Sequence, residues 1–227
     1  PFLRVYNRPE IVGVDNIPST GPAIIASNHQ SVMDSFFLPL LCPRQITFLA
    51  KAEYFNGTTP VGRLQKWFFT NVGQRPVNRT SASAGQDALN TAVEVLDDGD
   101  LFGIYPEGTR SPDGRLYKGK TGVARIALAS GAQVIPVAMI GTRDVNPIGT
   151  WFPRPGKVRV KVGDPIYPIE FVNNRGLERD SYEAIRALTD HIMRQLQQLS
   201  GQEYADVYAA EVKKALAEGG DSSPHNP

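Results

Sequence analysis

Short apolar runs alternate along the chain with longer segments in which apolar residues recur at helical spacing. The strand-like runs are residues 23–27, 46–50, 101–105, 133–140 and 157–162. The first four are almost continuously apolar, which is typical of strands buried on both faces of a sheet. In the fifth, valines alternate with basic residues, as expected of a strand near a sheet edge.

The segments between and after these runs have helical periodicity. We expect helices between the strands at residues 34–41, 62–69, 84–96 and 121–130. Alternating strands and helices predict an α/β fold, with a mostly parallel central sheet flanked by helices. After Pro168 the pattern is only helical, with expected helices at residues 181–199 and 203–217. We expect this C-terminal pair to be a packing appendage that contributes no site residue.

Composition indicates a single domain. The chain has 227 residues, of which 41% are hydrophobic, enough for one full core. We expect this domain to span residues 1–218, with a core at about 10–165, a helical appendage at about 178–218 and a disordered tail at 219–227. The chain begins at Pro1 rather than at a methionine, which is compatible with a missing upstream segment.

The scarcity of Cys and His excludes two kinds of site. Cys42 is the only cysteine, so the chain cannot form an internal disulfide. The three histidines, His29, His191 and His225, are too far apart to complete a structural zinc site with it, and we expect no metal. His29 is the imidazole in a position to act, because His191 lies on an expected helix and His225 in the tail.

The net charge of +1 conceals an asymmetry along the chain. Residues 1–163 carry 18 basic and 12 acidic side chains, whereas residues 164–227 carry 6 and 11. The first part is therefore the one expected to meet an anion. No run approaches the roughly 20 apolar residues of a membrane span, and no signal-peptide pattern opens the chain.

The first candidate site follows the strand at residues 23–27. His29 and Asp34 are five residues apart, so on one helix their side chains would point about 140° away from each other. They can meet only if His29 lies in a loop and Asp34 in the first turn of the next helix. His29 would then act as a general base that Asp34 orients. A structural alternative remains open, because Ser31 and Asp34 also fit a helix capping box.

Two further loops carry polar and basic side chains near strand ends. Residues 105–111 read Tyr-Pro-Glu-Gly-Thr-Arg-Ser and follow a buried strand. There Gly108 permits close backbone approach, and Arg110 offers a planar fork for a phosphate. Residues 73–79 add two more arginines. Both loops could also be ordinary polar turns on the surface.

Residues 114–121 match the P-loop pattern G-x-x-x-x-G-K-[ST] in every letter. This leaves a nucleotide-dependent kinase as an alternative, with Lys120 as its phosphate-binding lysine. However, eight residues, two of them prolines, separate the segment from the preceding expected strand. A P-loop follows its strand almost at once.

Taken together, these loops resemble the glycerolipid acyltransferase family, of the 1-acyl-sn-glycerol-3-phosphate acyltransferase type. The family's H-x4-D motif corresponds to His29 and Asp34, and its F-P-E-G-T-R-S motif to residues 105–111, with Tyr replacing Phe. Its arginine motif is matched more loosely, around Arg79. Order and spacing agree over about residues 10–165.

The resemblance implies an enzyme of phospholipid biosynthesis that moves a fatty acyl group from acyl-CoA or acyl-carrier protein to a hydroxyl of 1-acylglycerol 3-phosphate. The residues favour this chemistry independently, because a thioester is already activated and the alcohol needs only deprotonation and positioning. The chain has no G-x-S-x-G elbow, which disfavours a covalent intermediate. First acylation of glycerol 3-phosphate, the kinase and a non-catalytic lipid-binding module remain alternatives.

The same resemblance assigns roles to individual residues. His29 would be the base and Asp34 its orienting partner, with no cofactor besides the acyl donor. The acceptor phosphate would be bound by Arg79, Glu107, Gly108, Thr109 and Arg110. Accessory candidates are Asn28, Ser31, Lys118 and Lys120, the two lysines by charge alone.

The expected partners are the acyl donor, the glycerol phosphate acceptor and an anionic membrane surface, with no nucleic acid. Residues 44–79 carry six basic and one acidic side chain, which suits such a surface. The membrane-facing candidates are Arg63, Lys66, Trp67, Phe68 and Phe69. These aromatic residues could equally belong to the core. We expect a peripheral protein at the cytoplasmic face of a membrane.

Overall fold

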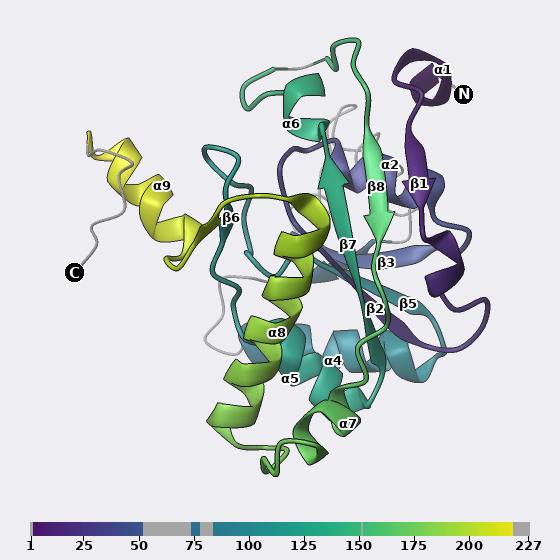
Figure 1. Ribbon diagram of the computed structural model, residues 1–227, viewed down its shortest axis with the longest axis vertical. Helices are drawn as coiled ribbons and strands as arrows, with labels where there is room; N and C mark the ends of the chain where they lie inside the picture. Colours follow the sequence, from purple (N-terminus) through teal and green to yellow (C-terminus); the bar gives the residue numbers. More distant parts are fainter. Residues whose placement is uncertain (1, 52–73, 78–83, 151, 220–227) are drawn as a thin grey trace.

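The computed structural model describes residues 3–49, 74–75, 84–150 and 152–219 in full, and the backbone alone at residues 2, 50, 51, 76 and 77 (Figure 1). Its centre is a seven-stranded sheet of order β1-β8-β7-β2-β5-β3-β4. Neighbours from β7 to β4 run parallel, β8 is antiparallel to β7, and β1 is parallel to β8. The strands are β1 (Glu10–Val12), β8 (Arg159–Val162), β7 (Gln133–Ile140), β2 (Ala23–Ser27), β5 (Leu101–Ile104), β3 (Ile46–Lys51) and β4 (Arg75–Val77). The expected mostly parallel sheet is confirmed.

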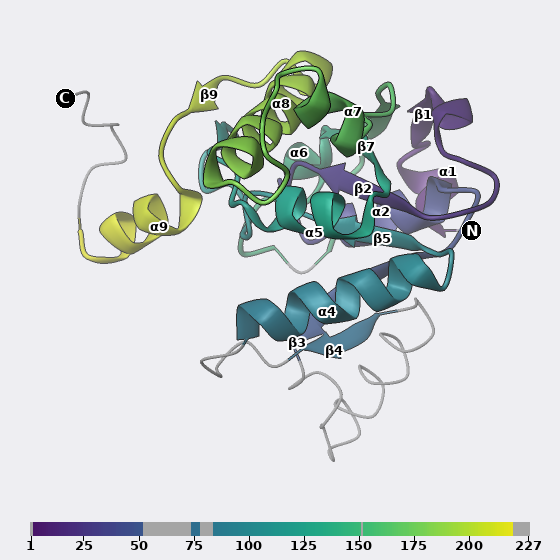
Figure 2. The same ribbon diagram turned by 90° about the horizontal axis from the view of Figure 1, so that it is seen from below.

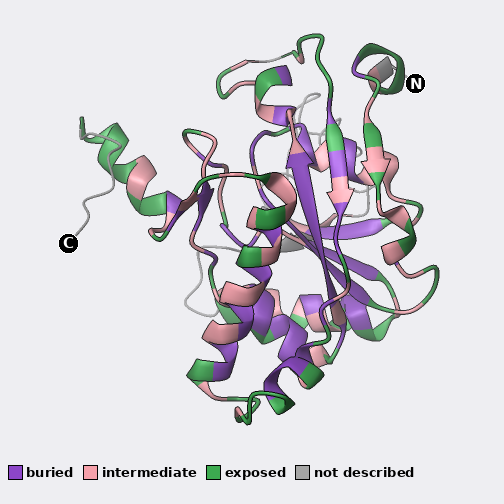
Figure 3. Ribbon diagram, in the orientation of Figure 1, coloured by how far each residue is buried: buried purple, intermediate pink, exposed green. Residues whose placement is uncertain are grey.

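Helices cover both faces of this sheet (Figures 1 and 2). Ile24 and Ala26 of β2 pack with α4 (Ala84–Asp97), α5 (Gly122–Ser130), α7 (Pro168–Asn173) and α8 (Tyr182–Ser200). Ala23 and Ile25 point the other way and pack with α2 (Asp34–Leu41). Because both faces are covered, β2 is buried along its whole length (Figure 3), as its continuous apolar run predicts.

Smaller elements complete the described chain. They are α1 (Phe2–Tyr6), the 3-10 helix η1 (Val14–Asn16), β6 (Leu116–Tyr117), α6 (Thr142–Val145), β9 (Tyr204–Ala205) and α9 (Ala209–Ala217). Among the described residues, no helix is both long and apolar enough to cross a bilayer.

The C-terminal helices differ from the expectation in one place. Helix α8 is confirmed as a packing helix, because Ser181 Oγ caps it at Ala184 N and its apolar face joins the core. The expected helix at residues 203–217 is wrong in its first part. There β9 pairs in parallel with β6, and α9 begins only at Ala209. This pairing joins segments about 90 residues apart, which local periodicity does not record.

Two expected segments lie wholly or mostly outside the described residues. These are the expected helix at residues 62–69 and, of the expected tail at 219–227, residues 220–227. The three-residue strands β1 and β4 were not expected, since three residues are too few to establish a period of two.

Gly103 in β5 makes room for an aromatic side chain that reaches toward the carboxyl ends of the strands. A Cβ at this position would lie 2.4 Å from Phe48 ring atoms of the neighbouring strand β3. The Phe48 ring lies 5.5 Å, centroid to centroid, from the ring of Tyr105. The missing side chain at Gly103 therefore determines where Phe48, and with it Tyr105, can lie.

We predict that Gly103→Ala lowers the free energy of unfolding by about 1–3 kcal/mol, because the added methyl group overlaps Phe48. Urea denaturation followed by tryptophan fluorescence measures this change. The matched control is Gly85→Ala in α4, where an added Cβ meets nothing within 4 Å. Helix propensity should make that variant slightly more stable, by up to about 1 kcal/mol. Equal destabilisation of both variants would contradict the packing explanation.

Candidate active site

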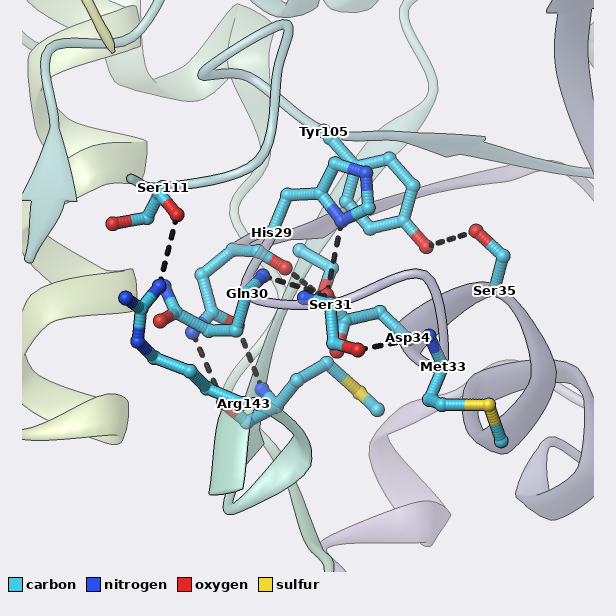
Figure 4. Close-up of polar contacts among 12 residues, drawn as sticks. His29, Gln30, Ser31, Met33, Asp34, Ser35, Tyr105, Ser111 and Arg143 are labelled. Atoms are coloured by element: carbon cyan, nitrogen blue, oxygen red, sulfur yellow. Dashed lines mark hydrogen bonds and ion pairs between the residues drawn. The ribbon is translucent and has the colours of Figure 1, made fainter. Parts of the chain in front are cut away.

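Loops from three neighbouring parallel strands meet at one edge of the sheet. His29 follows β2, Tyr105 follows β5, and Arg143 of α6 follows β7 (Figure 4). Open parallel sheets bind ligands at this carboxyl edge. The chain therefore brings the first two candidate loops together, as their positions after strands predict.

Asp34 organises the first loop through a single oxygen atom. Its Oδ2 accepts hydrogen bonds from the amides of Gln30 at 2.6 Å and Ser31 at 2.8 Å, and lies 2.9 Å from His29 Nδ1. The Asp34 side chain is fully buried. The same Asp34 oxygen therefore binds two amides ahead of α2 and contacts the His29 ring, whereas the N-cap position of α2, Met33, has no side-chain cap.

The ring of His29 is held on two sides. Because a carboxylate only accepts hydrogen bonds, the contact with Asp34 favours the tautomer with its proton on Nδ1. The ring also stacks on Tyr105, with 3.9 Å between centroids and 11° between planes (Figure 4). The Tyr105 hydroxyl lies 3.0 Å from Ser35 Oγ. In this arrangement Nε2 keeps its lone pair, and the side chain remains 17% exposed.

Sequence reasoning missed Tyr105 as a positioning residue. The signal was present, since Tyr replaces Phe in the second motif and brings a hydroxyl. Its partner Ser35 lies 70 positions away in the chain. Only the fold shows that the two are neighbours.

Glu107 joins the loops to each other instead of facing a phosphate. Its Oε1 accepts from the His29 amide at 2.9 Å and its Oε2 from the Tyr117 amide at 3.0 Å. The Ser111 amide donates to the His29 carbonyl at 2.8 Å and adds a second connection. Glu107 is fully buried, so its expected role in binding the acceptor phosphate is corrected to a structural one.

Burial also changes the acidity of this carboxyl. Desolvation raises the pKa of Glu107 to about 7, although the amides of His29 and Tyr117 act in the opposite direction.

Residues 108–110 of the same loop are at least partly exposed. Gly108 adopts a φ of +73° and its amide donates to the Tyr105 carbonyl. Thr109 and Arg110 are half-exposed, and Lys120 lies over Gly108, since a Cβ there would be 3.4 Å from Lys120 Nζ. The structure thus brings Gly108, Thr109, Arg110 and Lys120 together.

Other expected site residues lie elsewhere or have other contacts. Lys118 forms an ion pair with Asp206 at 3.0 Å. The side-chain amide of Asn28 donates to the Met139 carbonyl and to Gln202 Oε1, and its oxygen accepts from the Met139 amide. Ser31 Oγ donates to the Asn146 carbonyl. Asn28 and Ser31 are both buried, so they shape the loop without facing a ligand. Outside the described residues lie Arg79 and the membrane-facing candidates Arg63, Lys66, Trp67, Phe68 and Phe69.

Residues 114–121 do not form the phosphate-binding loop that their letters imitate. Strand β6 lies inside the segment. The amides of Leu116, Tyr117, Lys118 and Lys120 already donate to protein acceptors. A P-loop needs such amides free to hold phosphate, so the kinase interpretation loses its structural basis.

The C-terminal segment reaches the site, contrary to the expectation that it only packs. Gln202 accepts from the Asn28 side chain at 2.7 Å and donates to the Gly114 carbonyl at 2.6 Å. Lys213 of α9 donates to Thr109 Oγ1 at 2.7 Å. Sequence reasoning missed both residues, because neither lies in a motif.

No group of three or more His, Cys, Asp or Glu in the described part of the chain is arranged to hold a metal ion.

The family described as Acyltransferase matches residues 8–140. The chain is 33% identical over 169 residues to a chloroplastic 1-acyl-sn-glycerol-3-phosphate acyltransferase of Arabidopsis thaliana, which covers 74% of this chain and 45% of that protein. A 1-acyl-sn-glycerol-3-phosphate acyltransferase of Bacillus subtilis is 27% identical over 201 residues, or 87% of each chain.

Among solved structures, the chain is similar to the 1-acyl-sn-glycerophosphate acyltransferase PlsC of Thermotoga maritima. The TM-score is 0.65 at 32% sequence identity, over 84% of this chain and 71% of that one. The chain therefore belongs to the acyltransferase family. It spans about half the length of the plant relatives that it matches.

We predict that Glu107 makes stability depend on pH. A carboxyl with a raised pKa binds more protons folded than unfolded, so its contribution is present below its ordinary value of 4.5 and is lost as pH rises through about 7. From about pH 5 to pH 8, the free energy of unfolding should fall by about 2–3 kcal/mol in the wild type relative to Glu107→Gln.

Urea denaturation of both proteins across this pH range measures the difference. Glu107→Gln lowers stability at every pH by weakening the two amide contacts. The test is therefore the difference between the two proteins in how steeply the free energy of unfolding changes with pH. Parallel pH profiles would contradict the prediction.

Proposed function

We propose that this protein transfers a fatty acyl group from an acyl thioester to the free hydroxyl of 1-acylglycerol 3-phosphate. The observation that carries the proposal is the contact of His29 Nδ1 with Asp34, which leaves Nε2 as a base at the open edge of the sheet. The related Arabidopsis and Bacillus proteins are named for this activity, which supports the choice of acceptor.

The first step is attack by the acceptor hydroxyl on the thioester carbonyl carbon. His29 Nε2 takes the hydroxyl proton as the new carbon–oxygen bond forms. Asp34 stabilises the resulting imidazolium through its contact with Nδ1, because buried opposite charges attract strongly. A general base of this kind contributes about 10²- to 10⁴-fold in rate.

In the second step the tetrahedral intermediate collapses and the carbon–sulfur bond breaks. The thiolate leaves and takes the proton back from His29 Nε2, so His29 ends each cycle as it began it. The products are the ester and the free thiol. No enzyme nucleophile is needed, and burial raises the pKa of the Cys42 thiol, which makes it a poorer one.

Positioning of the two substrates supplies the rest of the rate. Arg110 and the hydroxyl of Thr109 lie in the loop that Glu107 attaches to His29, so a phosphate bound there is held relative to the base. This arrangement suits an acceptor that carries a phosphate near its hydroxyl. The buried carboxylate of Glu107 keeps the two loops together.

The donor, the membrane and the location belong to the same proposal. Acyl-CoA or acyl-carrier protein supplies the acyl group, with no further cofactor. Residues 44–79 supply the positive charge that an anionic bilayer attracts, as suits a peripheral enzyme that takes lipid substrates at the cytoplasmic face. A second acceptor, glycerol 3-phosphate, carries the same phosphate and is tested in parallel.

The test is an assay of thiol release from palmitoyl-CoA with each acceptor, followed by analysis of the acylated position. We expect turnover with 1-acylglycerol 3-phosphate and product acylated at its free hydroxyl. His29→Ala should lower kcat by at least about 10²-fold, because the base is lost.

The control variant is His191→Ala. His191 packs against Phe171, with ring centroids 4.8 Å apart, on the helix that carries no part of the dyad. It should retain activity. Full turnover in a folded His29→Ala protein would contradict the mechanism, and turnover only with glycerol 3-phosphate would contradict the acceptor. A lipid-binding module would bind phospholipid but release no thiol.

A further inference from the structure

Helix α9 brings a lysine to the loop beside the catalytic dyad. Lys213 Nζ donates to Thr109 Oγ1 at 2.7 Å, although the two residues are 104 positions apart. The side chain is half-buried. A lysine ammonium has three donors, and Thr109 accepts from one of them.

The charges around Lys213 favour an anion. Burial lowers the pKa of Lys213, and the nearby guanidinium of Arg110 lowers it further, while Glu107 opposes both. Among the described residues, no carboxylate forms an ion pair with Lys213, Arg110 or Lys120. Glu107, whose charge acts on Lys213, already accepts hydrogen bonds from two amides.

The backbone beneath these cations also offers donors. In the described part of the chain, the amides of Thr109 and Arg110 donate to no protein acceptor. Gly108 lets the Lys120 ammonium lie directly over the loop. Two free amides and three cations, none of them ion-paired within the described part of the chain, match the donors that a phosphate group accepts.

The contact is part of a larger attachment of the C-terminal segment. Ala205 and Ala209 pack with Tyr117 of β6, and β9 pairs with β6. The Tyr117 amide in turn donates to Glu107. Although α9 stands apart from the sheet (Figures 1 and 2), it is therefore connected to the His29 loop through Tyr117 and Glu107.

We propose that Lys213 is a phosphate-binding residue of the substrate site, contributed by helix α9 and acting together with Arg110 and Lys120. The ligand is a phosphate monoester, either that of the glycerol acceptor or the 3′-phosphate of CoA. The identity of these two ligands rests on the proposed function. The cluster of cations itself does not.

The test compares Lys213→Gln, which keeps a donor for Thr109 but removes the charge, with Lys213→Arg, which keeps the charge. Lys214→Gln is the matched control, since Lys214 is exposed on the same helix and forms an ion pair with Glu218, at 3.9 Å. Calorimetry with the full chain measures binding of glycerol 3-phosphate, CoA and dephospho-CoA. Circular dichroism verifies that each variant is folded.

We expect Lys213→Gln to weaken binding of one phosphate ligand about tenfold, with recovery in Lys213→Arg and no change in Lys214→Gln. If glycerol 3-phosphate binds more weakly, the ligand of Lys213 is the phosphate of the acceptor. If CoA binds more weakly while dephospho-CoA, which lacks the 3′-phosphate, binds as before, the ligand of Lys213 is the 3′-phosphate of the donor. In the acyl-transfer assay, KM for that substrate should rise while kcat stays within about twofold.

Unchanged binding of all three ligands in Lys213→Gln would overturn the proposal. So would equal losses in Lys213→Gln and Lys213→Arg, because that result indicates a role in attaching α9 only. If the wild-type chain released no thiol, the proposed function would fail, while the calorimetry would still decide the role of Lys213.

Discussion

The site depends on one buried carboxylate that accepts several hydrogen bonds at once. An ionised carboxyl without partners costs several kcal/mol to bury, and the amides of Gln30 and Ser31 together with His29 offset that cost. The same contacts turn the chain from β2 into α2 and orient the imidazole. Loss of Asp34 would therefore affect the start of a helix and the base together. This coupling explains how a pattern typical of helix capping and a proposed catalytic pair can share the same residues.

A second carboxylate extends this organisation across the sheet edge. Glu107 binds the amides of His29 and Tyr117, so it joins the loop after β2, the loop after β5 and strand β6 to one another. The aromatic rings of Phe48, Tyr105 and His29 follow one another toward the same edge. Buried polar contacts and ring stacking thus hold the His29 imidazole in place, while Thr109 and Arg110 of the loop after β5 stay half-exposed.

Most of the fold could be predicted from the sequence because its strands are continuous apolar runs and its long helices have clear periodicity. The pairing of His29 with Asp34 could be predicted as a possibility, since spacing limits where the two can meet. Other features could not be predicted, and three of them show why. The role of Glu107 depends on burial, β9 depends on pairing with the distant β6, and Lys213 reaches Thr109 only through the fold. Each is a contact between distant segments, which local patterns do not record.

The tautomer of His29 is the most direct test of the arrangement at Asp34. The chain has only three histidines, so a long-range proton–nitrogen NMR spectrum of the 15N-histidine-labelled protein can be assigned with the His29→Ala variant. At mildly alkaline pH we predict that His29 carries its proton on Nδ1 and has a bare Nε2. A proton on Nε2 with a bare Nδ1 would contradict the proposed base and its contact with Asp34.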